Sequence, residues 1–139
     1  MKTIFIFSGV LDSIQNTLCK FSAECGGIIA CNLEGHIVDY YFDKDAGVGN
    51  ISYCPTRIAL NDVVNKQWYP RGMHFGGIAH SHPLEARLHP SKEDLRTAHM
   101  ILNTNCLDSL VLIITQANAI KAWEIQQGNI LTECMLKCV

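Results

Sequence analysis

Hydrophobic residues recur along the chain with two different periods, one typical of strands and one typical of helices. Segments of the two kinds alternate, which predicts strands interleaved with helices. Continuous apolar or period-two segments predict strands, and they lie at residues 3–9, 26–31, 36–42, 73–82, 107–115, 119–125 and 130–137. Apolar residues three or four positions apart predict helices, and they lie at residues 11–21, 55–69 and 91–103. The pattern therefore favours an α/β fold with a single mixed β-sheet flanked by about three helices.

The predicted strand at residues 73–82 has an unusual polar ending. Its apolar, glycine-led run Gly-Gly-Ile-Ala is followed by His80, Ser81 and His82. Because side chains alternate faces along a strand, both imidazoles project from one face and Ser81 from the other. Asp94 lies one turn into the next predicted helix, so two imidazoles and one carboxylate can converge on a single ion. Such a set leaves a fourth tetrahedral position for water, which is the pattern of a catalytic zinc site.

Composition narrows the class of protein. The chain has 139 residues, of which 48% are hydrophobic and 17% charged, with a formal charge of −2. This length and composition predict one domain over residues 1–139 with a substantial core, and they argue against disorder and against a nucleic-acid partner. The apolar start at residues 1–7 is too short for a signal peptide or a membrane span. Seven cysteines without a CxxC pair favour a reducing cytoplasm over a disulfide framework.

Hydrolysis at such a site also needs a carboxylate that takes up and delivers a proton. The acidic candidates are Glu24, Glu34, Glu85 and Glu93. Glu24 ranks first because it lies at a predicted helix-to-strand junction, where its side chain can be held rigidly near the end of the sheet. Glu34 and Glu85 fall in a turn and a loop, and Glu93 points away from Asp94 around the helix. Spacing alone leaves the choice open.

Ser91 has two interpretations. It lies one helical turn before Asp94, so its hydroxyl can face the same ligand and donate to a developing oxyanion. The order Pro-Ser-x-x-Asp before an apolar periodic run is also typical of a helix N-cap. Both roles can hold together. The neighbouring His89 and His99 fit a solvated loop and a structural helix position better than a ligand set, and Cys25 fits core packing better than a nucleophile.

Together, Glu24, the run from His80 to Pro83, Ser91 and Asp94 resemble the JAMM motif of the JAB/MPN-type metalloproteases. That motif is a glutamate, then His-Ser/Thr-His-Pro, then a serine, two residues and an aspartate. The preceding run Ala-Glu-Cys-Gly-Gly-Ile-Ile at residues 23–29 is also similar to the family and favours Glu24. The resemblance extends from about residue 11 to residue 115 and is closest to the short prokaryotic JAB proteins. One departure is the eight residues between His82 and Ser91, where seven are commoner.

The resemblance implies a cytidine-deaminase-like fold and one zinc ion per chain. It implies that His80, His82 and Asp94 bind the metal, that Glu24 is the acid/base and that Ser91 helps to hold the water and stabilise the oxyanion. The implied reaction is hydrolysis of an isopeptide or peptide bond after the C-terminal Gly-Gly of a ubiquitin-like or sulfur-carrier protein. Composition and the short apolar start, considered above, indicate neither nucleic acid nor membrane as a partner.

Two alternatives to this function remain. One is a zinc hydrolase of the same fold that acts on small peptides or amides, which the short loop at residues 43–52 would suit. The other is a non-catalytic scaffold of MPN type. The scaffold is disfavoured because all five motif residues are present.

Overall fold

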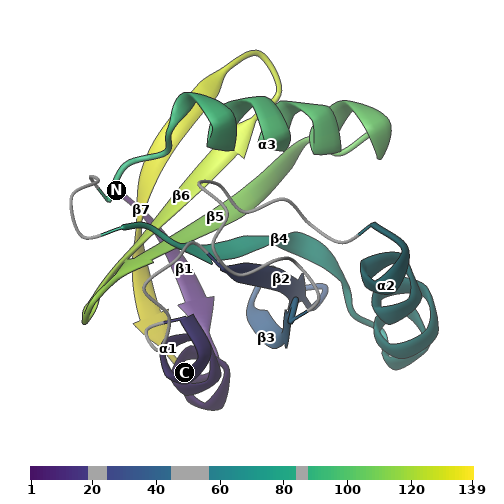
Figure 1. The fold of residues 1–139 in the computed structure, drawn as a ribbon. Helices are drawn as coiled ribbons and strands as arrows, with labels where there is room; N and C mark the ends of the chain where they lie inside the picture. Colours follow the sequence, from purple (N-terminus) through teal and green to yellow (C-terminus); the bar gives the residue numbers. More distant parts are fainter. Residues whose placement is uncertain (19–24, 45–56, 84–87) are drawn as a thin grey trace.

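Strands and helices alternate along most of the chain (Figure 1). The computed structural model describes residues 1–18, 25–44, 57–83 and 88–139. The strands are β1 (Lys2–Ile6), β2 (Gly26–Cys31), β3 (Ile37–Phe42), β4 (His74–Ser81), β5 (Ser109–Gln116), β6 (Ala119–Gln126) and β7 (Ile130–Cys138). The α-helices are α1 (Ser8–Leu18), α2 (Arg57–Asp62) and α3 (Lys92–Thr104).

The strands form one mixed sheet in the order β1-β3-β2-β4-β5-β6-β7. β4 and β5 run parallel, whereas β2 is antiparallel to both β3 and β4, and β6 is antiparallel to both β5 and β7. The sheet closes because β1 runs parallel to β7 along its whole length and meets β3 through the pair Ile6 and Ile37. The predicted mixed sheet with three helices is confirmed.

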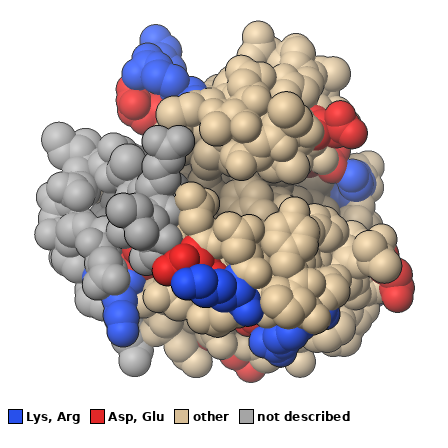
Figure 2. Space-filling model, turned by 90° about the vertical axis from the view of Figure 1, so that its right-hand side faces the viewer, with Lys and Arg blue, Asp and Glu red and all other residues tan. Residues whose placement is uncertain are grey.

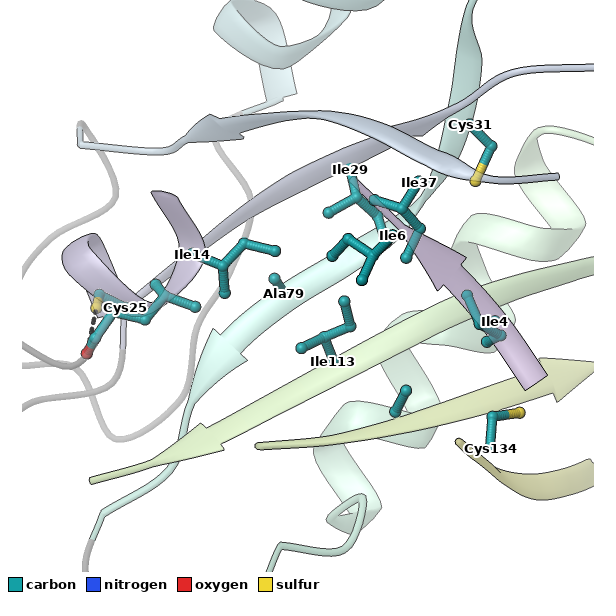
Figure 3. Packing of buried hydrophobic residues seen from close by; sticks show 12 residues of the cluster. Ile4, Ile6, Ile14, Cys25, Ile29, Cys31, Ile37, Ala79, Ile113 and Cys134 are labelled. Atoms are coloured by element: carbon teal, nitrogen blue, oxygen red, sulfur yellow. Dashed lines mark hydrogen bonds between the residues drawn. The ribbon is translucent and has the colours of Figure 1, made fainter. Parts of the chain in front are cut away.

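Helices cover both faces of the sheet, and each packs on its own apolar cluster. α1 contributes Ile14 to a cluster that includes Ala79 of β4 (Figure 3). α3 contributes Leu102 to a second cluster that includes Ile78, and Trp68 belongs to a third cluster beside α2. Because neighbouring residues of a strand face opposite sides, the residues that follow Ala79 alternate between the α3 side and the α1 side. Residue 80 therefore faces α3.

Gly77 explains why glycines precede the two histidines. Its φ is +155°, and a Cβ at this position would collide with the backbone of Val111 in β5. A residue without a Cβ is therefore required for β4 and β5 to pair this closely. The glycine keeps the end of β4 in register with β5.

The first helix begins earlier than predicted. The strand expected over residues 3–9 ends at Ile6, and α1 begins at Ser8 instead of Leu11. The physical reason is that the Phe7 carbonyl accepts the N–H groups of Val10 and Leu11 at 3.0 and 3.1 Å, which starts the helical turn there. The last three residues of the predicted helix, 19–21, lie outside the described residues.

The second predicted helix is not one α-helix over residues 55–69. After α2 the chain continues as a π-helical segment over Val63–Trp68 and a 3₁₀ turn over Tyr69–Arg71. Pro70 has no N–H to continue an α-helical ladder, and the Tyr69 N–H bonds to the Val64 carbonyl, a π-helical spacing. Gly72 then ends the segment with a φ of +74°. The predicted start at residues 55–56 lies outside the described residues.

None of the helices in the described ranges combines the length and the apolar composition that a membrane crossing requires. Figure 2 shows the face of the molecule that lies on the right in Figure 1. Over the coloured residues of that face, charged side chains lie singly or beside an opposite charge, and no run of one sign forms.

Candidate metal centre

β4 presents two imidazoles on the α3 side of the sheet. His80 lies in the strand and His82 directly after it, and their side chains are 3% and 6% exposed. The His82 backbone N–H donates to the Thr115 carbonyl at 2.8 Å, so the pairing of β4 with β5 continues through His82. The two rings stack with their centroids 4.8 Å apart and their planes 21° apart. The strand alternation thus places both imidazoles together, as the sequence predicts.

Ser91 and Asp94 hold each other at the start of α3. Ser91 is the N-cap residue, and its Oγ accepts the Asp94 N–H at 3.0 Å. In return, the Asp94 carboxylate accepts the Ser91 N–H at 2.8 Å through Oδ2. This reciprocal pair is a capping box, which fixes both side chains at the helix N-terminus. The predicted N-cap is confirmed, and the same box orients the carboxylate toward the imidazoles.

The imidazoles at the end of β4 lie next to the carboxylate at the start of α3. His80 Nε2 lies 2.9 Å from Asp94 Oδ1, and His82 Nε2 lies 3.0 Å from Asp94 Oδ2. One ligand atom from each of the three residues lies within 4.8 Å of the other two. The three residues that the sequence predicts as ligands are therefore adjacent, and they can hold a metal ion.

The donor set fits a zinc ion. Two imidazole nitrogens and one carboxylate oxygen are ligands that zinc accepts, with a fourth position left for water. His80 is buried, yet neither of its ring nitrogens makes an aligned hydrogen bond within the described part of the chain. Its Nε2 contacts Asp94 at ion-pair distance only. A buried polar atom without a hydrogen bond costs free energy, and coordination to a cation would remove that cost.

The charge state of Asp94 also suits a cation. Burial alone raises the pKa of the Asp94 carboxyl, but the imidazoles of His80 and His82 and the Ser91 N–H stabilise the carboxylate more strongly. The net pKa lies well below its usual range. Asp94 is therefore ionised at neutral pH, which is the form that binds a metal.

Glu24, the predicted acid/base, lies outside the described residues, so its role stays a prediction. The residue after it, Cys25, is described and is 5% exposed in the α1 cluster, which confirms core packing for this thiol. The Cys25 N–H donates to Ser81 Oγ at 3.1 Å, and the Cys25 carbonyl accepts the Ser81 N–H at 2.9 Å. The chain next to Glu24 is thereby fastened to the residue between the two imidazoles.

The cluster contains neither His89 nor His99. The His89 ring instead lies edge-on against Trp123, with centroids 4.8 Å apart. Two further side chains were not identified from the sequence. Gln116 and Trp123 donate hydrogen bonds to backbone carbonyls of the connection between β4 and α3. A buried indole N–H generally needs an acceptor, and this signal could have drawn attention to Trp123. No local pattern identifies which carbonyl it meets.

Fold and cluster together define a class of protein: an α/β domain with a mixed sheet that carries a His-x-His and Ser-x-x-Asp metal-binding set between a strand end and a helix start. Comparison with known families agrees. The chain belongs to the family of prokaryotic homologues of the JAB domain, which it matches over residues 10–126.

Solved structures share this fold. The solution structure of protein DSY2949 from Desulfitobacterium hafniense matches with a TM-score of 0.63 and 20% identity, covering 98% of this chain and 94% of that chain. The crystal structure of AF2198, a JAB1/MPN domain protein from Archaeoglobus fulgidus, matches with a TM-score of 0.54 and 14% identity, covering 98% of each chain. No curated protein matches the chain. The predicted JAB/MPN fold is confirmed.

Proposed function

We propose that the protein is a zinc-dependent isopeptidase or peptidase that cleaves after the C-terminal Gly-Gly of a ubiquitin-like or sulfur-carrier protein. The observation that carries the proposal is the convergence of His80, His82 and Asp94. Membership of the JAB family supports hydrolysis as the reaction. The proposed stoichiometry is one zinc ion per chain.

His80, His82 and Asp94 would hold the metal. A bound zinc ion supplies Lewis-acid chemistry, since it polarises a carbonyl and lowers the pKa of water to about 7. The Ser91 hydroxyl accepts the Asp94 N–H, so its own proton is available to donate to the oxyanion that develops on the scissile carbonyl. One such donor contributes about 10²–10³ in rate.

Glu24 is the proposed acid/base. It would take a proton from the attacking water and deliver it to the leaving amine, a role worth about 10²–10⁴ in rate. The two hydrogen bonds between Cys25 and Ser81 support this assignment, because they tie the residue next to Glu24 to the strand that carries both imidazoles.

The resemblance to the JAB family supports the proposed substrate class. A Gly-Gly tail is narrow and extended, so it can enter a tight groove and add to a sheet edge through main-chain hydrogen bonds. A cytoplasmic location and a single domain over residues 1–139 remain predictions of the same proposal. Within the described ranges, Cys31, Cys106, Cys134 and Cys138 carry free thiols, which suits a reducing compartment.

The Glu24→Gln variant tests the mechanism. We expect it to keep one zinc ion per chain and to lose about 10²–10⁴ in cleavage rate, measured by elemental analysis and by mass spectrometry of a Gly-Gly-terminated fusion. The matched control is Glu93→Gln, since Glu93 is exposed on α3 and pairs with Arg96. This control should keep both zinc and turnover. A Glu24→Gln variant that cuts at the wild-type rate would remove Glu24 from the mechanism.

A second comparison tests the substrate. The full-length fusion should be cleaved faster than a short peptide that contains only its Gly-Gly tail, because a protein substrate offers further contacts. Equal rates would favour a hydrolase of small peptides or amides. Zinc binding without cleavage of either substrate would favour a scaffold.

A further inference from the structure

We propose that Gln116 and Trp123 of the β5–β6 hairpin are positioning residues that hold the two halves of the metal centre at their working separation. The inference rests on the proposed metal site and goes beyond it, because neither side chain belongs to the ligand set. The two halves are the imidazoles at the end of β4 and the Ser91–Asp94 capping box at the start of α3. Residues 83–90 connect them.

Gln116 holds the first end of this connection. It is the last residue of β5, one position beyond Thr115, whose carbonyl accepts the His82 N–H at 2.8 Å. The Gln116 Nε2 donates to the Pro83 carbonyl at 2.7 Å. The backbone is thus bonded to β5 at two successive residues, at His82 through the main chain and at Pro83 through the Gln116 side-chain amide.

Trp123 holds the second end. Its Nε1 donates to the Leu88 carbonyl at 3.3 Å, and its ring packs against the edge of the His89 ring. The indole is 8% exposed and belongs to the same apolar cluster as Leu102 of α3, with Leu88 packed against that cluster. The Trp123 side chain therefore joins the connection, the sheet and the helix that carries Asp94.

The hydrogen bond to Leu88 can affect the metal centre because Leu88 is close in sequence to the capping box. Only two residues separate Leu88 from Ser91, so a shift of the Leu88 backbone moves the capping box and with it the Asp94 carboxylate. Metal–ligand distances tolerate deviations of only about 0.2 Å. Partners that orient metal ligands typically contribute about 10–100-fold in metal affinity. Gln116 and Trp123 act on the ligands through the backbone, so we expect effects at the lower end of that range.

The test compares two pairs of matched variants. Gln116→Met and Trp123→Phe remove the two N–H donors and keep most of the side-chain volume. The controls are Gln127→Met and Trp68→Phe, because Gln127 donates to the Leu107 carbonyl at 3.1 Å and Trp68 donates to Asp39 at 3.1 Å, both away from the ligand cluster. Each variant and its control lose an N–H donor of the same side-chain type, although the Trp68 acceptor is a carboxylate and the Trp123 acceptor is a backbone carbonyl.

The readouts are the zinc dissociation constant, measured by competition with a chromophoric chelator, the visible spectrum of the Co²⁺-substituted protein, and the unfolding midpoint without metal. We expect Gln116→Met and Trp123→Phe to weaken zinc binding about 10-fold and to change the Co²⁺ spectrum. Both controls should keep the wild-type values of these two quantities while losing similar thermal stability.

Two results would overturn the inference. Wild-type zinc affinity and spectrum in both Gln116→Met and Trp123→Phe would show that the hairpin does not position the ligands. Equal losses in the controls would show a general effect of destabilisation. A wild-type protein that binds no zinc would instead refute the metal centre itself, so the two failures are distinguishable. Neither readout depends on cleavage of any substrate.

Discussion

The two ends of β2 border very different polar environments. β2 begins beside His80, where the ligand cluster lies, and ends beside the start of β3, near the N-terminus of α1. At this second end a cavity of about 460 Å³ is lined by residues that include Phe7, Asp39 and Tyr40. The ligand cluster instead brings three ionisable side chains together.

The two carboxylates show what separates these environments. Asp39 Oδ1 accepts the N–H of Tyr40 at 2.8 Å, and its Oδ2 accepts the indole N–H of Trp68 at 3.1 Å. Asp94 instead faces two imidazoles, one of which makes no aligned hydrogen bond within the described residues. Both donors to Asp39 are uncharged N–H groups, which is consistent with a structural role for this carboxylate. Converging ionisable groups therefore distinguish the candidate metal centre from the other end of β2.

Removal of one ligand should have the largest effect. His82→Ala leaves a two-residue set, so we expect zinc affinity to fall by more than about 100-fold, beyond the loss typical of residues that only orient ligands. Asp39→Asn, the matched change at the other end, should leave zinc affinity unchanged. Isothermal titration calorimetry measures both. A comparable loss of zinc binding in Asp39→Asn would erase the distinction between the two ends.

Truncation of the capping serine should have an intermediate effect. Ser91→Ala removes a cap, which costs about 1 kcal/mol of stability, and also removes the proposed oxyanion donor, which costs about 10²–10³ in turnover. Ser13→Ala is the control, because the Ser13 hydroxyl donates to the Gly9 carbonyl on the exposed side of α1. Chemical denaturation and single-turnover kinetics separate the two losses. If Ser91→Ala lowers stability alone, Ser91 is only a cap.

The smallest effect concerns a thiol at the end of β2 opposite the candidate metal centre. Burial raises the pKa of the Cys31 thiol from 9.0 to about 11. Below pH 9 the thiol is protonated in both the folded and the unfolded state, so stability does not change. As pH rises from 9 toward 11, the unfolded state loses the proton first, and stability falls by an amount on the order of 2 kcal/mol.

Urea denaturation of wild type and Cys31→Ala at pH 8 and pH 10.5 measures this contribution. The free energy of unfolding should fall more steeply with pH in the wild type than in the variant. Parallel slopes would mean that the Cys31 thiol titrates normally and that this end of β2 is less well buried than its packing indicates.

Both halves of the cluster could be predicted from sequence, because each depends on local geometry. The period of a strand places His80 and His82 on one side, and the capping pattern places Ser91 and Asp94 together at a helix start. Their meeting depends on tertiary packing, which spacing does not determine. The position of Asp94 one turn into the helix after the strand suggested that step, and the resemblance to the JAMM motif supported it. The structure brings His80, His82 and Asp94 together.

Other features could not be predicted for physical reasons. The pairing of β1 with β7 joins the two ends of the sequence, and no local pattern encodes so distant a contact. The π-helical segment after α2 keeps an apolar stripe like that of an α-helix, so periodicity alone does not reveal it. Gln116 and Trp123 look like a strand end and a core aromatic. Their carbonyl acceptors appear only once the connection before α3 is folded.

The most direct test of the metal centre is anomalous diffraction at the zinc absorption edge, from crystals grown with zinc. We predict a single strong peak about 2.0–2.2 Å from His80 Nε2, His82 Nε2 and one Asp94 carboxylate oxygen. At saturating zinc, a map with no peak at that position, or with its peak on other residues, would contradict the assignment.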